Sequence, residues 1–84
     1  MKKDKEIDPQ LTSDIEKILK EVGSRIRSKR KIISKNYENF AEEYHFNKIT
    51  VSRIEKGENS SLKSIITLAR AVGIKIEDLF KGIQ

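Results

Sequence analysis

Apolar residues recur at helical spacing along most of the chain, and five helices account for the pattern. The first apolar stripe consists of Leu11, Ile15, Ile18, Leu19, Val22, Ile26 and Ile33. Thr12 or Ser13 is suited to cap this helix, which we predict over about residues 13–33. Gly23 lies inside it and is a poor helix former, so we expect Gly23 to separate an N-terminal extension from the helix proper.

Two short helices are predicted next, over residues 37–44 and 48–56. Asn36 and Asn47 are favourable caps for them, and Gly57 is a typical residue just after a helix end. Their inward positions are Phe40, Ala41 and Tyr44 in the first helix and Val51 and Ile54 in the second. Helices of about two turns are unstable alone, so both must be held by packing.

A fourth helix is predicted from a Ser61 cap to Gly73, and a short fifth helix from Ile76 to Phe80. The stripe of the fourth helix consists of Leu62, Ile65, Ile66, Leu68, Ala69 and Val72. The chain contains no sustained strand-like alternation and no internal repeat. The pattern therefore predicts an all-α fold, a compact bundle of five short helices in one domain of residues 13–84. Residues 1–12 are charged and contain Pro9, so we expect them to form a flexible arm.

Charge adds a candidate partner to this picture. The chain has 18 Lys and Arg against 13 Asp and Glu, a formal net charge of +5. No acidic residue interrupts a basic run formed by Arg25, Arg27, Lys29, Arg30, Lys31 and Lys35. A basic balance favours an anionic partner, either nucleic acid or an anionic membrane, although such a run is also compatible with an ordinary solvated helix face.

Several function classes are not expected. The chain has no cysteine and a single histidine, His45, so a local metal site cannot be assembled, and no glycine-rich phosphate loop is present. We therefore expect no enzymatic activity, no metal and no cofactor. No apolar run approaches the roughly 20 residues that cross a bilayer, and the charged start does not look like a signal peptide. A cytoplasmic protein without a membrane partner is the expectation.

The residues from 36 to 57 form a more specific pattern than helical periodicity alone. Ala41 is small, Val51 and Ile54 are spaced to point inward, and the segment ends Ser-Arg-Ile-Glu-Lys-Gly at residues 52–57. These features resemble the helix-turn-helix of the Cro/C1 (XRE-type) family of transcriptional regulators, which have a lambda-repressor-like DNA-binding domain. The resemblance implies that the two helices cross closely at Ala41 and that Val51 and Ile54 are buried. The resemblance extends over about residues 22–81. It places the motif at about 37–56 and a recognition helix at about 48–56.

Three positions depart from the family pattern. His45 stands where the turn usually has glycine, a place that often requires a positive φ. Tyr37 replaces a common glutamine at the start of the motif, and Ser60 stands where proline is frequent.

The resemblance implies that the start of the recognition helix enters the major groove of double-stranded DNA. The residues it implies for base contact are Lys48, Ile49, Thr50, Ser52 and Arg53. Arg53 could bind guanine through two hydrogen bonds, and Ile49 could meet a thymine methyl group. The alternatives are a phosphate contact or a free surface charge for Arg53, and packing of Ile49 on Phe46 or Tyr44.

Flanking residues are expected to hold the DNA backbone. The implied phosphate contacts are Arg27, Lys31, Asn36, Tyr37, Asn47 and Lys56, with capping as the certain role of both asparagines. Acidic side chains should lie away from the DNA or at its margin, namely Glu38, Glu42, Glu43 and Glu58. The resemblance also implies a partly buried ion pair between Arg30 and Glu55, which would tie the first helix to the recognition helix.

The implied function is a sequence-specific transcriptional regulator, expected as a repressor that binds a pseudo-palindromic operator as a homodimer. Candidate dimer contacts are Ile76, Phe80 and Ile83, whereas Leu79 is expected in the core. The alternative is an antitoxin or a restriction-modification controller protein of the same fold whose main partner is another protein. The extension at residues 1–20 is a candidate docking or dimerisation helix, or it simply covers its own core. RNA binding is less expected because a helix cannot enter the narrow major groove of A-form RNA.

Overall fold

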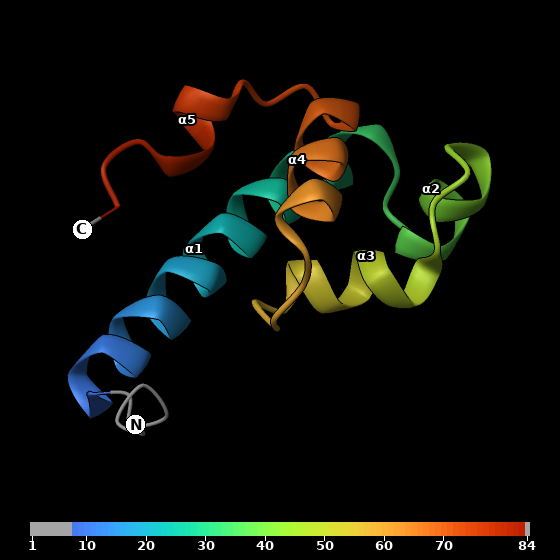
Figure 1. Cartoon of the computed structure of the whole chain (residues 1–84). Coiled ribbons are helices and arrows are strands. Elements are labelled where there is room, and N and C mark those ends of the chain that lie inside the picture. The colour runs from blue at the N-terminus through green and yellow to red at the C-terminus, as the bar shows by residue number, and fades with distance from the viewer. Residues whose placement is uncertain (1–7, 84) are drawn as a thin grey trace.

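The computed structural model describes residues 8–83 of the chain, and five α-helices follow one another in this part (Figure 1). They are α1 (Pro9–Ile33), α2 (Tyr37–Glu43), α3 (Lys48–Glu55), α4 (Leu62–Ala71) and α5 (Ile76–Phe80). No β-strand occurs between residues 8 and 83. The predicted all-α fold of five helices is confirmed.

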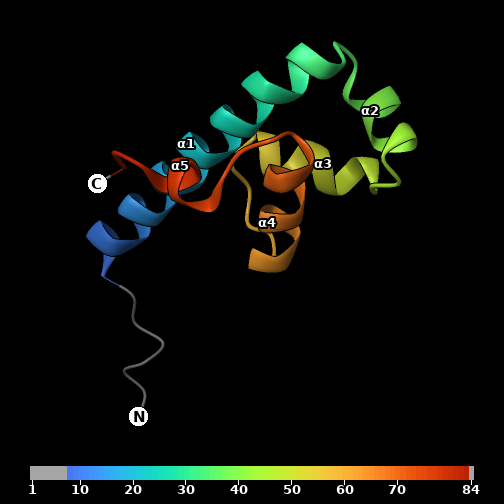
Figure 2. The same ribbon diagram turned by 90° about the horizontal axis from the view of Figure 1, so that it is seen from above.

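The long helix α1 is the support on which the other helices assemble. It contacts α2, α3 and α5 directly, and α4 lies against α3 and α5. Figures 1 and 2 show the four shorter helices gathered around the later turns of α1, while its first turns project beyond them. The fold therefore consists of a small helical body with one protruding helix end.

The predicted start of the first helix at residue 13 is wrong, because α1 begins at Pro9. The Asp8 side chain caps the helix, with its Oδ1 accepting a hydrogen bond from the backbone N–H of Gln10 at 3.0 Å. Proline suits the first helical position, since its fixed φ is already helical and no N–H is needed there. Residues 9–12, assigned to a flexible arm from the sequence, thus form the first turn; residues 1–7 lie outside the described part.

Gly23 does not divide α1, contrary to the expectation from its poor helix propensity. The helix passes through it without a break, and the residue is buried. A Cβ atom at this position would lie 2.2 Å from the carbonyl oxygen of Ile54 and 3.0 Å from that of Glu55. Glycine is therefore required because the end of α3 crosses α1 in direct backbone contact at this point.

The core lies between α1 and the four shorter helices. Its largest fully buried side chains are Phe40, Ile26, Leu68, Leu79 and Val51. The ring of Phe40 stacks on Tyr44 and Phe46, with centroid separations of 4.5 and 6.0 Å. Burial of Leu79 confirms the inward position expected for it. This aromatic and aliphatic packing stabilises the two-turn helices, which could not persist alone.

The predicted apolar stripe of α1 is only partly buried. Val22 and Ile26 belong to the core, but Leu11 and Ile15 remain 52% and 46% exposed. Ile33, at the opposite end, is also exposed. The periodicity predicted the helix correctly but not its burial, because the buried residues of α1 lie only between Val22 and Arg30 and the stripe extends beyond them at both ends.

The turn between α2 and α3 requires an unusual backbone conformation. His45 has φ = 61°, the only positive φ of a non-glycine residue between residues 8 and 83. The chain then returns through a 2.7 Å hydrogen bond from the Phe46 N–H to the Ala41 carbonyl oxygen. Ala41 itself is buried, as its predicted role at a close crossing requires. The expected need for positive φ at His45 is confirmed.

Candidate nucleic-acid interface

Both helices of the α2–turn–α3 unit are capped by the predicted asparagines. Asn36 Oδ1 accepts hydrogen bonds from the N–H groups of Glu38 and Asn39 at 2.7 and 3.1 Å. Asn47 Oδ1 accepts from Ile49 and Thr50 at 2.9 and 3.1 Å. Since Oδ1 is used as the cap at each site, a contact to a phosphate would use the Nδ2 group of the same side chain.

The outward face of α3 combines basic and apolar side chains. Lys48 and Arg53 have side chains that are 63% and 62% exposed. Ile49 lies between them on this face and is 61% exposed. Val51 and Ile54 occupy the opposite side of the helix and are buried. The face that carries these three side chains is therefore directed away from the rest of the protein.

Thr50 and Ser52, the other two residues implied for base contact, flank this outward face and are half-buried. Thr50 lines an open cavity of about 420 Å³ between the turn, α3 and α4. Ser52 lines a different cavity on the other side of α3. Of the five implied residues, the structure thus exposes three fully and places the remaining two on either side.

The alternative packing of Ile49 on an aromatic ring finds no support. Tyr44 and Phe46 both stack on Phe40, and Phe46 belongs to the side chains packed against the core. Ile49 keeps more than half of its surface exposed. Exposure of a large apolar side chain at the tip of a short helix is unfavourable unless an apolar group covers it.

An open cavity of about 330 Å³ lies where α1, α2 and α3 meet. Its lining residues are Arg27, Arg30, Tyr37, Ser52, Glu55 and Lys56. The structure thus brings three of the implied phosphate-contacting residues together, from three different helices or their ends. Lys31, Asn36 and Asn47 are exposed but do not line this cavity.

Arg30 and Glu55 form the inner wall of this cavity. Arg30 Nε and Nη2 donate to Glu55 Oε2 and Oε1 at 2.8 and 2.7 Å, and both side chains are at least nine-tenths buried. Arg30 Nη1 also donates to the Ser34 carbonyl oxygen at 2.9 Å. The hydrogen bond to Glu55 raises the pKa of Arg30 above its ordinary value, against the opposing effect of burial. The ion pair implied by the resemblance is present and joins α1 to the end of α3.

Two acidic residues lie beside the basic side chains of the outward face of α3. Glu38 Oε2 is 3.8 Å from Lys48 Nζ, and Glu58 Oε1 is 3.6 Å from Arg53 Nε. The sequence placed both acids away from the DNA or at its margin. Their positions follow from local geometry, because Glu38 is in the first turn of α2 and Glu58 follows directly after the end of α3.

Arg25 has a structural role that the sequence did not indicate. It pairs with Glu21 at 3.1 Å, the spacing expected for residues four apart on a helix. Its Nη1 also donates to the carbonyl oxygens of Asp78 and Leu79, at 3.0 and 3.3 Å. Arg25 therefore holds the end of the short helix α5 against α1. The sequence itself shows only the four-residue spacing of Glu21 and Arg25, which is favourable on a helix.

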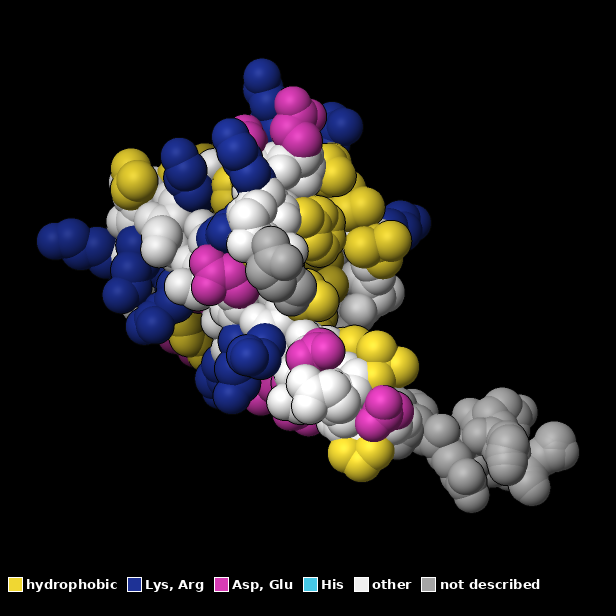
Figure 3. Space-filling view, turned by 90° about the vertical axis from the view of Figure 1, so that its left-hand side faces the viewer, with side chains coloured by type: hydrophobic (Ala, Val, Ile, Leu, Met, Phe, Trp, Pro, Cys, Tyr) yellow, Lys and Arg dark blue, Asp and Glu magenta, His cyan; other side chains and the backbone are white. Residues whose placement is uncertain are grey.

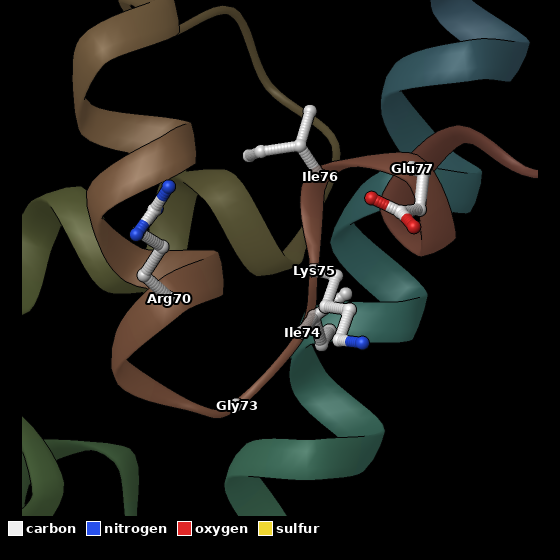
Figure 4. Close-up of a pocket in the computed structure, with 6 residues that line it drawn as sticks. All are labelled: Arg70, Gly73, Ile74, Lys75, Ile76 and Glu77. Atoms are coloured by element: carbon white, nitrogen blue, oxygen red, sulfur yellow. The ribbon is translucent and has the colours of Figure 1, made fainter.

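The three candidate dimer residues differ in their surroundings. Phe80 is 39% exposed, Ile76 is half-buried, and Ile83 packs against the core. Figure 3 shows hydrophobic side chains gathered along one side of the face that carries α5 and the C-terminus, with Lys and Arg along the other. An open cavity of about 520 Å³ lies between α4 and the start of α5, where Ile76 points toward α4 and Arg70 (Figure 4).

No helix between residues 8 and 83 has both the length and the apolar character needed to cross a membrane. Comparisons with protein-family models, with curated proteins and with solved structures find no match to this chain.

Proposed function

We propose that this protein is a sequence-specific DNA-binding transcriptional regulator, a repressor that binds a pseudo-palindromic operator as a homodimer. The observation that carries the proposal is the outward face of α3, where Ile49 is 61% exposed between Lys48 and Arg53. The major groove offers that combination of partners, since guanine presents two acceptors and thymine an exposed methyl group.

The proposed complex places the start of α3 in the major groove, which is wide enough to admit one α-helix. Lys48, Ile49 and Arg53 then face the base edges, with Thr50 and Ser52 at the margins. The cavity formed by α1, α2 and α3 presents Arg27, Tyr37 and Lys56 on one flank. Side chains of these types commonly bind phosphate oxygens and fix the register of a protein on DNA without reading its sequence.

The remaining implied phosphate contacts have weaker support. Lys31 is exposed on α1 outside the shared cavity. Asn36 and Asn47 are occupied as caps through Oδ1 and would contribute through Nδ2. These three residues would add affinity at the edge of the complex rather than define its centre.

A dimer is part of the proposal because one short helix reads only a few base pairs. Two copies whose recognition helices are about 34–36 Å apart would read half-sites separated by one DNA turn. The proposed contact is the surface of α5 at Phe80, which is 39% exposed, with Ile76 beside it at the open cavity next to α4. Arg25 holds the end of α5 in place. Ile83 would support this surface from beneath rather than contact the partner, because it packs on the core.

The second candidate function is protein binding, as an antitoxin or a restriction-modification controller would require. Its supporting observation is the projecting start of α1, where Leu11 and Ile15 leave about half of their surface exposed. A Leu11→Ser, Ile15→Ser double variant would lose a partner captured from the source cell while keeping DNA affinity. Loss of DNA affinity together with the partner would count against two separate surfaces.

The proposed function is tested by selecting binding sites from randomised double-stranded DNA with the wild-type protein. The expected result is one enriched consensus with two related half-sites in inverted orientation, about 10–10.5 base pairs apart. Absence of any enriched sequence would refute the proposal and leave protein binding as the leading function.

A further inference from the structure

Each of the two long basic side chains on the outward face of α3 lies beside a carboxylate. The closer pair joins Arg53 Nε to Glu58 Oε1 at 3.6 Å, and these side chains are 62% and 53% exposed. An exposed pair of this kind contributes little to folding stability, because water and salt screen the attraction. What the pair can influence is the orientation of the Arg53 guanidinium group.

The backbone anchors Glu58 next to Arg53. The Glu58 N–H donates to the Arg53 carbonyl oxygen at 2.9 Å, and the Gly57 N–H donates to the Ile54 carbonyl oxygen at 3.0 Å. Gly57 adopts φ = 82°, which reverses the chain at the helix end. The backbone of Glu58 is therefore held by the same helix end that carries Arg53. No contact from another helix is needed to bring its carboxylate near Arg53.

The atom that faces the carboxylate determines which edge of the guanidinium is left for DNA. Arginine carries five N–H donors in a planar fork, and here the Nε edge is directed toward Glu58. The terminal edge, formed by Nη1 and Nη2, presents two parallel donors. That spacing matches the O6 and N7 acceptors of guanine in the major groove.

We infer that Glu58 is a positioning residue for Arg53, which orients the terminal edge of its guanidinium toward guanine. The inference rests on the proposed DNA-binding function and adds a specificity determinant that does not itself contact the base. Without Glu58 the guanidinium samples more orientations and binds the nearest phosphate as readily as a base. Guanine discrimination then falls at the one position that Arg53 reads.

Glu58 has a second, separable effect through its charge. A carboxylate near the DNA backbone repels phosphates of every sequence, so its removal raises affinity for all DNA, most strongly at low salt. This general effect does not require Arg53. The positioning effect requires Arg53, so a double-mutant cycle with Arg53 distinguishes the positioning effect from the general charge effect.

The test uses the selected consensus site and a copy in which the guanine assigned to Arg53 is replaced. That guanine is the base whose preference disappears in Arg53→Ala. Affinity for both DNAs is measured for wild type, Glu58→Ala, Arg53→Ala and the double variant. We expect Glu58→Ala to lower the guanine preference about 2- to 5-fold, the range that a weak exposed ion pair can supply. In the Arg53→Ala background, Glu58→Ala should leave base preference unchanged and still raise affinity for both DNAs.

The control is Glu42→Ala, which removes the same charge from an exposed position of α2. It should leave the guanine preference as in wild type. An unchanged guanine preference in Glu58→Ala would overturn the inference, even if the affinity for both DNAs rises. The inference also fails if no base preference depends on Arg53. A wild-type protein that enriches no sequence at all would refute the proposed function itself, a result distinct from these.

Discussion

The guanidinium of Arg30 and the carboxylate of Glu55 form two hydrogen bonds of 2.7 and 2.8 Å beneath the cavity shared by α1, α2 and α3. Fork-to-fork geometry of this kind fixes both distance and direction between the two side chains. One partner is on α1 and the other is the last residue of α3, so the pair joins the end of α3 to α1.

Removing one partner of this pair should be costly. Glu55→Ala leaves the Arg30 charge buried without its partner, and we expect a loss of about 3–5 kcal/mol in the free energy of unfolding. The pKa of Arg30 is raised by its hydrogen bond to Glu55, so the stability that Arg30 contributes through its own titration is present below the ordinary arginine pKa and is lost as pH rises through the raised value. Urea unfolding measures the loss.

The control for this prediction is Glu21→Ala, which breaks the exposed pair with Arg25 four residues away. Its cost should stay below about 1 kcal/mol, since exposed pairs contribute little. A Glu55→Ala variant as stable as wild type would contradict the structural role assigned to the buried pair.

Gly23→Ala should destabilise the protein although alanine is the better helix former. A Cβ atom would lie 2.2 Å from the Ile54 carbonyl oxygen, so α1 and α3 would have to separate. Overpacking of this type costs about 1–3 kcal/mol, more than the roughly 1 kcal/mol that alanine gains in helix propensity. Thermal unfolding followed by circular dichroism provides the measurement. A variant with a higher Tm than wild type would show that the two backbones are not in close contact.

His45→Gly should stabilise the protein. The φ of 61° at this residue is costly for a side chain with a Cβ atom and free for glycine. We expect a gain of about 0.5–1 kcal/mol, because glycine's greater freedom in the unfolded chain offsets part of the relief. His45→Ala keeps the Cβ atom and should not share this gain. Equal stability of the two variants in urea would contradict the strain at the turn.

Residues proposed to contact bases and residues proposed to contact phosphates should respond differently to substitution, the former in a sequence-dependent way and the latter in a salt-dependent way. Ile49→Ala should lower affinity by about 1 kcal/mol only for DNA with thymine at one half-site position. Lys56→Ala should weaken binding to all sequences alike and reduce the slope of log K against log salt by about 1. Titrations on matched DNAs at several salt concentrations separate the two. Equal losses on every sequence for Ile49→Ala would remove it from the base-reading face.

The helices and their caps were predictable because their signals are local. Asn36, Asn47 and Ser61 each cap the helix that follows, as their side-chain chemistry indicates. Gly57 and Gly73 adopt positive φ where helices end. The early start of α1 was missed since Pro9 can either end a flexible segment or begin a helix, and the Asp8 cap decides between the two.

Features that depend on distant contacts were not predictable in the same way. From the sequence, Gly23 was expected to weaken the helix. The structure shows why glycine is needed there, because the α3 backbone at Ile54, 31 residues later in the chain, lies against it. The bonds from Arg25 to the end of α5 span 53 and 54 residues and have no sequence pattern. The positions of Glu38 and Glu58 beside Lys48 and Arg53 likewise required the helix ends to be placed in space.

The most direct test of the proposed function is the affinity of the wild-type protein for its selected site and for a scrambled site of equal length and composition, at two salt concentrations. We predict a selected-to-scrambled ratio of about 10³ or more at physiological salt, with both affinities falling as salt rises. A ratio near one, with weak binding that salt abolishes, would contradict sequence-specific regulation by the outward face of α3.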